Sequence, residues 1–387
     1  MTGKILYFVT EDWYFSSHRL NIARASKEKG MEVIVVTRVD KHLNVMLNEG
    51  FKVYPLNLVR SGKNIIKELI CIKRIIDIYI KEKPDIVHHV ALKPILYGSI
   101  AANITKIPYI VNAFPGLGYI FSTKSLLTFL FKRLLVLLYR IIFSSSGTIA
   151  IFQNIDNMSY FVKRGIITKD KAFLIRGSGV DTHEFLPKPE PDGVFTVMMA
   201  SRMLWDKGVG EMIEAAKIFK TRNLPCRVVL VGKTDPENPN SVPDNILRQL
   251  NNDGIIQWWG YKENMAEIIS MAHIIVLPTI YDEGVPKVLI EAASCARPII
   301  TTNMPGCRDI VRDNENGILI EPNDIDALTN AILKLMQSPE LRDKMGKRGR
   351  AIVIEEFSTD IVVNTTTVIY ENLLNKDKNS HFTSASK

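Results

Sequence analysis

Two glutamates beside a predicted helix start could bind a sugar that is carried on a diphosphate. Glu283 lies in a predicted loop, and Glu291 lies one helical turn beyond Lys287 on the same face of the predicted helix. One carboxylate could accept hydrogen bonds from the hydroxyls of a sugar, and the other from the hydroxyls of a ribose. Two glutamates with this spacing also arise by chance, so the alternative interpretation is a helix with an exposed glutamate and a separate loop glutamate.

The helix start between the two glutamates is predicted to be an anion site. Residues 274–277 form a short, β-branched apolar run typical of a buried parallel strand, and Pro286 suits the first position of the following helix. The backbone N–H groups of Val288 and Leu289 would then be free at the helix start, where negative charge is favoured. The predicted ligand between the two carboxylates is therefore a diphosphate.

The residues around this site form a longer motif that resembles a known family. E-G-V-P-K-V-L-I-E-A at 283–292 is followed by C-A-R-P at 295–298 and by N-M-P-G-C-R-D at 303–309. Together they resemble the donor-binding signature of the retaining glycosyltransferases of family 4, which have the GT-B fold. The resemblance implies a catalytic role for Glu283. It also implies donor-sugar contacts from Glu283, Gly284, Val285, Pro286 and Lys287.

The second motif departs from the family at one position. Ala296 stands where relatives usually have glycine, which is expected to alter the local packing slightly.

Two cations follow the strand that is predicted to open the second domain. Arg202 and Lys207 lie in S-R-M-L-W-D-K-G. A guanidinium can hold phosphate oxygens as a planar fork, and an ammonium can hold them as a point charge. Two surface cations in a solvated loop are the alternative, but the family has an Arg and a Lys five residues apart at this turn. By resemblance, both bind the donor diphosphate together with Val288 and Leu289.

No metal ion or other cofactor is expected. The only Asp-x-Asp triplet is residues 324–326, which start a predicted helix and are interpreted as its cap. The helix start, Arg202 and Lys207 would then stabilise the departing nucleotide in place of a cation.

The nucleobase is expected near Q-W-W-G-Y-K-E-N-M at 257–265. In the family the loop at Gly260 and Tyr261 borders the base, so the resemblance implies a UDP-sugar donor with backbone contacts to uracil. Gly232 ends another predicted strand near this site, and Glu291 would bind the ribose. Aromatic residues after a strand more often pack than stack on a base, so a packing role for the two tryptophans is also open.

The acceptor side is predicted at strand ends in the first half of the chain. His88 and His89 end the apolar strand in D-I-V-H-H-V-A-L-K-P, where an imidazole could accept a proton or bond a sugar hydroxyl. The family has one histidine at this turn, and either of the two could match it. The turn that contains His18 lacks the glycines of many relatives. The other acceptor-side candidates are His18, Lys93, Asn112, Gly116 and Gly118.

Residues 124–143 form a predicted helix that is typical of a helix lying in an anionic membrane surface. Basic residues gather on about half of its circumference, and leucines fill the other half. The basic residues expected to meet the membrane are Lys124, Lys132, Arg133 and Arg140. A core helix with basic residues at its solvent edge is the alternative.

The elements that must position these residues follow an α/β pattern, with short apolar runs alternating with helical patterns. Strands are predicted at 4–9, 32–37, 51–54, 85–89, 108–112, 147–151 and 172–175, and helices begin near 18, 41, 63, 94, 124 and 156. After a Pro-rich, charged linker at 186–193, strands are predicted at 194–200, 226–231, 255–258, 273–277 and 298–301.

This pattern predicts two Rossmann-like, doubly wound domains with the donor site in the cleft between them. Residues 1–187 would bind the acceptor, and residues 188–357 the nucleotide sugar. The resemblance implies that a last helix at 358–375 crosses back to the first domain. Residues 376–387 have no apolar period and are predicted to be disordered.

Composition agrees with a two-domain enzyme that has an anionic partner. The chain has 387 residues, and residues 1–190 carry 27 Lys and Arg against 15 Asp and Glu. The four cysteines lack the spacing of a disulfide framework or zinc site, which favours a reduced, cytosolic chain. The amino terminus is interpreted as a first strand and not as a signal peptide. No run reaches the roughly 18 apolar residues of a membrane span.

By resemblance, the sequence predicts a retaining hexosyltransferase at the inner face of the bacterial cytoplasmic membrane. It would move a hexose or an N-acetylhexosamine from a UDP-sugar to a polyprenyl-diphosphate-linked saccharide, in O-antigen, capsule or protein-glycan biosynthesis. Nucleic acid is not an expected partner. The alternatives are a non-hydrolysing UDP-sugar 2-epimerase, which needs no acceptor, and a non-catalytic nucleotide-sugar-binding protein. An NAD oxidoreductase is excluded because no Gly-x-Gly-x-x-Gly turn follows a predicted strand.

Overall fold

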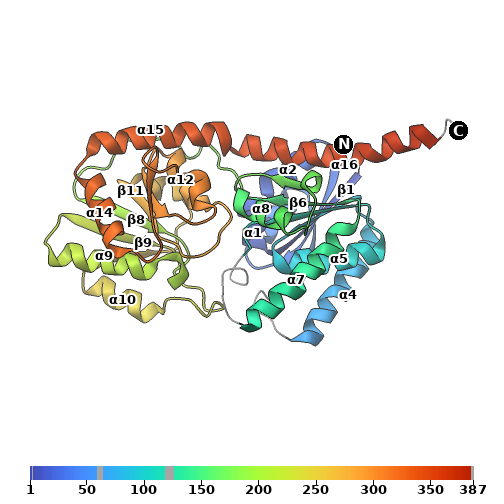
Figure 1. Cartoon of the computed structure of the whole chain (residues 1–387), viewed down its shortest axis with the longest axis horizontal. Coiled ribbons are helices and arrows are strands. Elements are labelled where there is room, and N and C mark those ends of the chain that lie inside the picture. The colour runs from blue at the N-terminus through green and yellow to red at the C-terminus, as the bar shows by residue number, and fades with distance from the viewer. Residues whose placement is uncertain (2, 59–63, 118–125, 385–387) are drawn as a thin grey trace. The chain divides into compact units, whose positions relative to one another are not determined.

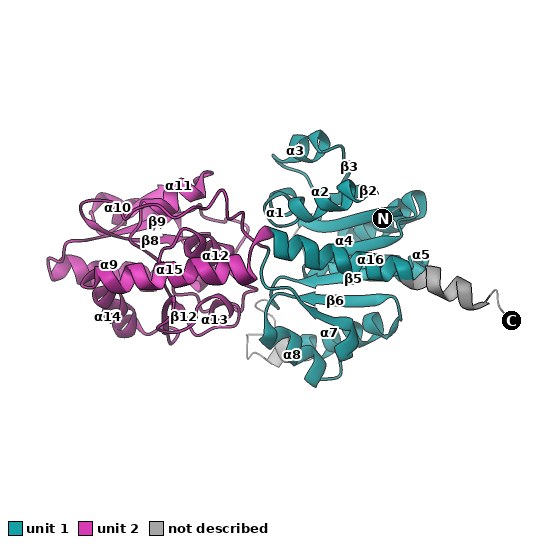
Figure 2. Ribbon diagram, turned by 90° about the horizontal axis from the view of Figure 1, so that it is seen from above, with its two compact units in different colours: residues 1–178, 360–387 teal, residues 179–359 magenta. Residues whose placement is uncertain are grey.

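The computed structural model describes residues 1, 3–58, 64–117 and 126–384, with the side chains at 126–130 and 376–384 left aside. The chain forms two compact units (Figure 2). Unit 1 comprises residues 1–178 and 360–387, and unit 2 comprises residues 179–359.

The boundary between the units lies earlier than the predicted one at residue 187. The backbone after Gly179 is already bonded to unit 2, because Val180 N donates to Phe357 O at 3.1 Å. Ser294 Oγ and an Arg350 guanidinium nitrogen both donate to the carbonyl of Phe185, each at 2.8 Å. The Pro-rich run at 186–193 therefore follows the boundary instead of forming it.

Unit 1 is built on a seven-stranded parallel sheet of order β3-β2-β1-β4-β5-β6-β7. All seven strands predicted in the first half are present. The strands are β1 (Gly3–Glu11), β2 (Met31–Arg38), β3 (Lys52–Pro55), β4 (Ile86–Val90), β5 (Tyr109–Phe114), β6 (Thr148–Phe152) and β7 (Ala172–Leu174). The helices are α1 (Asp12–His18), α2 (Leu20–Glu28), α3 (Leu43–Asn48), α4 (Ile65–Glu82), α5 (Leu92–Thr105), α7 (Leu126–Ser144), α8 (Ile155–Lys163), the 3-10 turn η1 (Lys169–Lys171) and α16 (Thr359–Ser384).

Alternate residues of the central strands face two different helix layers, because side chains alternate along a strand. Ile5 and Tyr7 pack in a core with residues of α1, α2, α3 and α16, whereas Leu6 and Phe8 pack in a core with α4 and α5. Helices α4, α5 and α7 lie side by side in Figure 1. Neighbouring residues of β4 must therefore point to opposite layers.

Unit 2 is built on a six-stranded parallel sheet of order β10-β9-β8-β11-β12-β13. The strands are β8 (Phe195–Ala200), β9 (Cys226–Val231), β10 (Gln257–Gly260), β11 (Ile274–Leu277), β12 (Ile299–Thr302) and β13 (Gly317–Ile320). The helices are η2 (Trp205–Lys207), α9 (Val209–Thr221), α10 (Asp244–Asn252), α11 (Met265–Ser270), α12 (Lys287–Ser294), α13 (Cys307–Ile310), α14 (Ile325–Met336) and α15 (Pro339–Glu356). The edge strand β13 was not predicted; its sequence, G-I-L-I, begins with glycine, which is depleted in strands.

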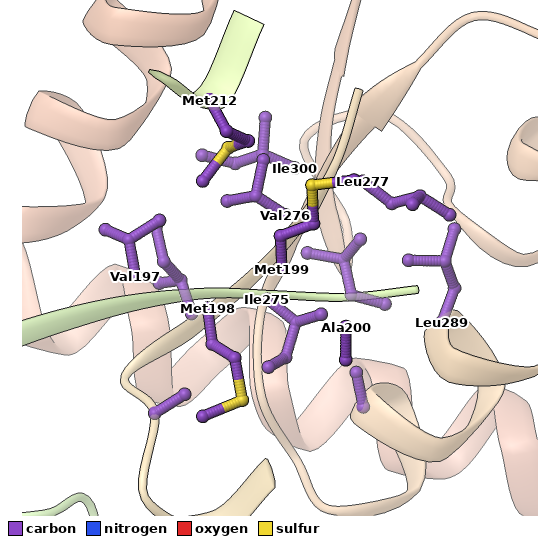
Figure 3. Close-up of a cluster of buried hydrophobic side chains, with 14 of the residues drawn as sticks. Val197, Met198, Met199, Ala200, Met212, Ile275, Val276, Leu277, Leu289 and Ile300 are labelled. Carbon is purple, nitrogen blue, oxygen red and sulfur yellow. The ribbon is translucent and has the colours of Figure 1, made fainter. Parts of the chain in front are cut away.

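The core of unit 2 is centred on β8 and β11 (Figure 3). In Figure 3, the side chains of Met198 and Met199 leave β8 in opposite directions, and both are fully buried. A strand buried on both faces has no polar side to show in the sequence, which explains the continuous apolar runs that predicted these strands.

Side-chain caps fix several helix starts. The caps of α4, α8, α11 and α14 each accept a hydrogen bond from a backbone N–H three residues further along. For α14 the cap is Asp324, whose Oδ1 accepts from Ala327 N at 2.8 Å. The predicted capping role of the Asp-x-Asp triplet is therefore confirmed.

The last helix, α16, belongs to unit 1. Val362, Ile369, Tyr370 and Leu373 enter the core of unit 1 beside β1. The helix continues to Ser384, where disorder was predicted, because extending a formed helix costs less than nucleating one. In the described part of the chain, no helix is long and apolar enough to cross a membrane.

Candidate active site

The candidate donor site lies where the strand order of the unit 2 sheet reverses. β8 and β11 are neighbours, with β9 on one flank and β12 on the other. The carboxyl ends of strands at such a reversal are the usual ligand site of an open parallel sheet. Arg202 and Lys207 follow β8, and Glu283 follows β11. The topology therefore brings three of the predicted residues to one place.

Lys207 and Glu283 form an ion pair between the two loops. Their side chains are only 13% and 14% exposed, so water screens the pair weakly. Thr279 Oγ1 lies 3.3 Å from Glu283 Oε1 and 3.1 Å from Asp206 O. Ile280 N also donates to Asp206 O at 3.0 Å, which ties the two loops together. Lys207, which is predicted to bind the diphosphate, and Glu283, the predicted catalytic carboxylate, are thus in direct contact.

Arg202 has a different partner. Its guanidinium bonds Asp235, with 2.6 Å between Nη1 and Oδ2. Asp235 follows β9 and had no predicted role, although its position after a neighbouring strand could have indicated one. The Arg202 side chain is 35% exposed, so exchanging this carboxylate for a phosphate would cost little.

The start of α12 differs from its prediction. Pro286 is the residue before the helix, with φ −61° and ψ 121°, and the helix begins at Lys287. Leu289 N donates to Pro286 O at 3.0 Å, so the prediction of a free Leu289 amide is wrong. The physical reason is a tight first turn, which uses that N–H within the chain. The Val288 amide precedes the first intrahelical bond, at a helix start that favours an anion.

The loop before α12 rests on the second half of the motif. Gly284, Val285 and Pro286 are buried, and only Glu283 and Lys287 of the predicted sugar-binding residues keep partly exposed side chains. Gly306 supports this loop: its φ is +81°, and an added Cβ would lie 1.3 Å from the carbonyl of Gly284. Glycine is required there because no side chain fits.

Glu291 and Lys287 lie on the same face of α12, as predicted. The distance from Lys287 Nζ to the Glu291 carboxylate is 3.6 Å. Glu291 is buried, and burial raises its pKa above the ordinary value of 4.5, an effect that the Lys287 charge partly opposes.

The predicted base-binding residues cluster at the ends of β9 and β10. Gly232 N donates to Gly260 O at 2.8 Å, and the Trp258 indole N–H donates to Gly232 O at 2.9 Å. Trp258 therefore has the packing role that was left open. A Cβ on Gly232 would lie 1.8 Å from the carbonyl of Ser201. Tyr261 is exposed, and its ring lies near the Lys233 ammonium.

His89 cannot act on an acceptor, so that prediction is corrected. Its Nε2 bonds the Tyr79 hydroxyl and its Nδ1 bonds Asn112 Oδ1, each at 2.9 Å. Burial lowers the pKa of His89 to about 4, so the ring is neutral. Asn112 lies within β5, fully buried on the same face, and is likewise structural instead of facing an acceptor. The alternation of β4 turns His89, and that of β5 turns Asn112, toward the core with α4 and α5.

His88 faces the other layer. It is buried, its Nδ1 bonds the Tyr370 hydroxyl of α16, and its Nε2 has no partner among the described residues. Burial, the Arg19 charge and the neighbouring His89 hold the pKa of His88 well below its usual range. It lines a small cavity at the carboxyl ends of the strands of unit 1.

The remaining acceptor-side candidates are dispersed. The His18 ring stacks on Tyr14, with 4.0 Å between centroids. Lys93 Nζ lies 2.7 Å from Glu68 Oε1, so its charge is already paired. Gly116 follows β5 and is partly exposed. Gly118 lies outside the described residues.

Helix α7 has one buried and one exposed apolar face. Leu135, Tyr139 and Ile142 enter a core with β5 and β6, in agreement with a structural role for part of the helix. Leu134, Leu137 and Ile141 are 51%, 53% and 59% exposed.

The basic residues of α7 have different surroundings. Lys132 lies near the Tyr160 ring, and an Arg140 guanidinium nitrogen donates to Arg164 O at 2.8 Å. Arg133 is exposed. Lys124 lies outside the described residues. Where the structure describes the chain, no group of three or more His, Cys, Asp or Glu could hold a metal ion.

The chain is similar to known proteins over most of its length. Residues 181–352 match the family of glycosyl transferases group 1, and residues 4–154 match the glycosyl transferase 4-like family. A Campylobacter jejuni protein is named N,N'-diacetylbacillosaminyl-diphospho-undecaprenol alpha-1,3-N-acetylgalactosaminyltransferase. It is 24% identical to this chain, and the match covers 92% of this chain and 95% of that protein. The capsular polysaccharide biosynthesis glycosyltransferase CapM of Staphylococcus aureus is 26% identical over 91% and 93%.

Solved structures show the same fold. A glycosyltransferase of Rickettsia africae has a TM-score of 0.78 at 22% identity, with 96% of this chain and 99% of that chain covered. HepE of Anabaena, in complex with UDP and glucose, has a TM-score of 0.75 at 15% identity, with 95% and 99% covered. The family matches span both units, and the motif residues gather at the strand reversal. The chain therefore belongs to the family 4 glycosyltransferases of the GT-B fold.

Proposed function

We propose that this glycosyltransferase moves a hexose or an N-acetylhexosamine from a UDP-sugar to a saccharide carried on polyprenyl diphosphate, with retention of the anomeric configuration. The names of relatives support both substrate classes. An Escherichia coli relative, 26% identical over 84% of this chain and 85% of its own, is named a UDP-Gal:alpha-D-GlcNAc-diphosphoundecaprenol alpha-1,3-galactosyltransferase. The product would serve bacterial glycan biosynthesis, such as O-antigen, capsule or protein glycan.

The Lys207–Glu283 pair carries the donor assignment. A diphosphate at the start of α12 would lie against the Lys207 ammonium and the Val288 amide. Its charge would compete with Glu283 for Lys207 and release the carboxylate to bond sugar hydroxyls. The pair therefore holds both side chains in place until the donor exchanges their partners.

Transfer with retention needs no protein base. The acceptor hydroxyl oxygen bonds the anomeric carbon on the face from which UDP leaves, and the bond from that carbon to the diphosphate oxygen breaks. The acceptor proton passes to the departing diphosphate oxygen. Lys207, Arg202 and the α12 start stabilise the negative charge that develops on UDP. Glu283 orients the sugar.

These positive groups support a metal-independent reaction without a further cofactor. Full activity after treatment with EDTA is the expected result. Loss of activity that added Mg²⁺ or Mn²⁺ restores would contradict it.

The proposal is tested by offering the enzyme a panel of UDP-sugars with and without a polyprenyl-diphosphate saccharide. We expect transfer only with the acceptor, and NMR of the product should show the anomeric configuration of the donor. The Glu283→Gln variant should bind UDP and lose transfer by 100-fold or more, a magnitude of the order seen when a transition-state contact is removed. Epimerised donor without acceptor would instead support a 2-epimerase, and binding without turnover a non-catalytic protein.

We further propose that α7 holds the enzyme on the anionic inner surface of the cytoplasmic membrane. Leu134, Leu137 and Ile141 lie on one face of the helix and are exposed. Arg133 and Arg140, which lie about two turns apart, are exposed beside this face. An exposed apolar stripe with basic flanks is the composition of a helix that lies in a lipid interface. The acceptor is itself a lipid, so this location brings the enzyme to its substrate.

A further inference from the structure

A buried arginine lies at the strand reversal of the unit 1 sheet without a carboxylate partner in the described chain. Arg19 is 4% exposed and lies between α1 and α2. One guanidinium nitrogen, Nη1, donates to His18 O at 3.0 Å, and Nε has no partner. A buried cation needs a counter-charge to offset its lost hydration. The Arg19 guanidinium therefore needs an anionic partner, which the described residues do not supply.

The tyrosine side chains on which the Arg19 charge acts are neutral. They are the phenols of Tyr7, Tyr14 and Tyr370. Burial raises the pKa of all three, that of Tyr7 to about 12, so the phenols stay protonated at physiological pH. None of them can neutralise the guanidinium.

The two acidic residues nearest in sequence are engaged elsewhere. Glu11 Oε2 accepts from Arg38 Nε at 3.0 Å. The Asp12 carboxylate accepts from the backbone amides of Trp13 at 2.7 Å, Asp40 at 2.7 Å and His42 at 2.9 Å. These contacts hold the turn after β1 in place and leave Arg19 without an anion from it.

Another buried arginine shows what a paired guanidinium looks like in this protein. Arg342 is 6% exposed, and its fork holds both oxygens of Glu190, at 2.8 and 2.7 Å. The same side chain also donates to the carbonyl of Leu335 at 2.6 Å. Arg19 is equally buried and has none of this carboxylate bonding.

A second unpartnered group lies beside Arg19. His88 and Arg19 both line a cavity of about 10 Å³, which also meets Gln153 of the loop after β6, Gly177, and Thr366 of α16. His88 is 1% exposed, and its Nε2 has no partner among the described residues. The cavity is partly open and has room for roughly one water molecule or one phosphate oxygen.

The position of this cavity matches the usual ligand position of the fold. β1 and β4 are neighbours at the strand reversal of the unit 1 sheet, with β2 and β5 on their flanks. Arg19 follows β1, His88 lies on β4, and Arg19 with Ile22 of the first turn of α2 lines the cavity. The positive end of α2 adds to the Arg19 charge there.

We propose that Arg19 and His88 bind one phosphate oxygen of the diphosphate that carries the acceptor saccharide. This inference rests on the proposed function, because the acceptor there is a polyprenyl diphosphate. One oxygen enters the cavity, and the rest of the phosphate group stays outside it. Arg19 supplies the charge, and His88 supplies a directional hydrogen bond.

The hydrogen-bond chain behind His88 can provide the required donor. Ser26 Oγ donates to Ile22 O at 2.8 Å and lies 3.1 Å from the Tyr7 hydroxyl. When the Tyr370 hydroxyl donates to His88 Nδ1, the imidazole proton is on Nε2 and can be donated to the phosphate oxygen. His88 is therefore a neutral donor in this site and not a proton acceptor.

The kinetic test compares two acceptors that carry the same saccharide. One has a polyprenyl diphosphate and the other a neutral alkyl chain of similar length. Wild type should prefer the diphosphate acceptor in kcat/KM, and Arg19→Met should lose about tenfold or more of that preference with KM for the donor unchanged. Arg19→Lys keeps the charge without the fork and should recover part of it.

A thermal measurement separates binding from a structural role. Arg19→Met removes an unpaired buried charge, so its Tm should equal or exceed that of wild type. The matched control is Arg342→Met, which leaves Glu190 unpaired and should lower Tm. With UDP saturating the donor site, inorganic pyrophosphate should raise the Tm of wild type and not that of Arg19→Met.

Each outcome decides the matter. The proposal would be overturned if Arg19→Met kept the preference for the diphosphate acceptor, or if pyrophosphate protected both proteins equally. It would also be overturned if Arg19→Met lost activity equally with both acceptors and had a lower Tm. These results would favour a bound water or a structural arginine. If wild type used neither acceptor with any UDP-sugar, the proposed function would fail. The pyrophosphate measurement would still test the anion site by itself.

Discussion

Two ion pairs between single residues hold the candidate donor site in place. Lys207 and Glu283 join two loops that follow different strands, and Lys287 and Glu291 join two turns of one helix. In each pair the carboxylate is largely shielded from water, so its partner affects both stability and binding.

Replacing Lys207 with Met should weaken UDP binding by about tenfold or more, because a charge-assisted bond to the diphosphate is lost. It should also cost about 1–3 kcal/mol of unfolding free energy, since Glu283 stays shielded without its partner. Calorimetric titration with UDP and chemical denaturation measure the two effects. Lys217→Met is the matched control, because the Lys217–Glu214 pair is exposed and should contribute nothing measurable. An unchanged UDP affinity would remove Lys207 from the donor site.

Glu291 should make the protein less stable as pH rises. Burial raises its folded pKa above 4.5, so the folded state binds more protons than the unfolded state above that pH. Stability from this group is therefore full below 4.5 and is lost as pH rises through the folded pKa. Glu291→Gln should stabilise the protein more at pH 7 than at pH 4 in urea denaturation. Equal effects at both pH values would show that Lys287 compensates the burial completely.

At the scale of elements, the end of α12 explains a departure from the family motif. Ala296 has φ +55°, its N–H donates to Ala293 O at 3.0 Å, and Arg297 N donates to Ala292 O at 2.9 Å. This bonding is a Schellman turn, whose left-handed residue is usually glycine. Relatives that have glycine here avoid the strain that alanine accepts.

Ala296→Gly should therefore stabilise the protein by up to about 1 kcal/mol, since relief of left-handed strain exceeds the entropy that glycine adds to the unfolded chain. Thermal unfolding should show a higher Tm with unchanged transfer activity. A lower Tm would mean that the alanine methyl group contributes more by packing than it costs in strain.

The packing of α12 against α15 gives the opposite expectation for a glycine. A Cβ on Gly346 of α15 would lie 2.1 Å from the carbonyl of Ala296. Gly346→Ala should cost about 1–3 kcal/mol because backbone and not a flexible side chain must move. Denaturant titration measures the loss. Gly349→Ala in the same helix is the matched control, because its added Cβ would meet no atom closer than 3.4 Å and should cost much less.

The whole molecule combines a basic first half with an exposed apolar stripe on α7. Changing Lys132, Arg133 and Arg140 together to Glu should release the enzyme from vesicles that contain phosphatidylglycerol, because the charge attraction becomes repulsion. Co-sedimentation measures the bound fraction, and wild-type binding should fall as salt is added. Lys217, Arg248 and Lys347 of unit 2 changed to Glu make the same charge change away from α7 and should leave binding intact. If the α7 variant still sedimented with the vesicles, the interpretation of α7 as a core helix would be favoured.

The class of fold and most of the helices and strands follow from the amino-acid sequence alone. Parallel strands buried on both faces are continuous apolar runs, which is why twelve of the strands appear close to their predicted positions. By resemblance to the family, the motif at 283–309, Arg202 and Lys207 indicated the loops of the candidate donor site. The short helix α1 has too few residues for a periodic pattern, and the edge strand β13 begins with a glycine, which is depleted in strands.

The side chains that line a cavity could be identified only from the folded chain. His88 and His89 are adjacent in sequence, and the pleat of β4 sends one to a cavity beside Arg19 and the other into bonds with Tyr79 and Asn112. Partner identity is equally non-local: Glu283 takes Lys207 from 76 residues away, whereas Arg342 has Glu190 and Arg19 has no carboxylate in the described chain. Periodicity in a sequence records which residues are buried. The partner that each buried charge meets depends on contacts between distant segments, which exist only once the sheet has formed.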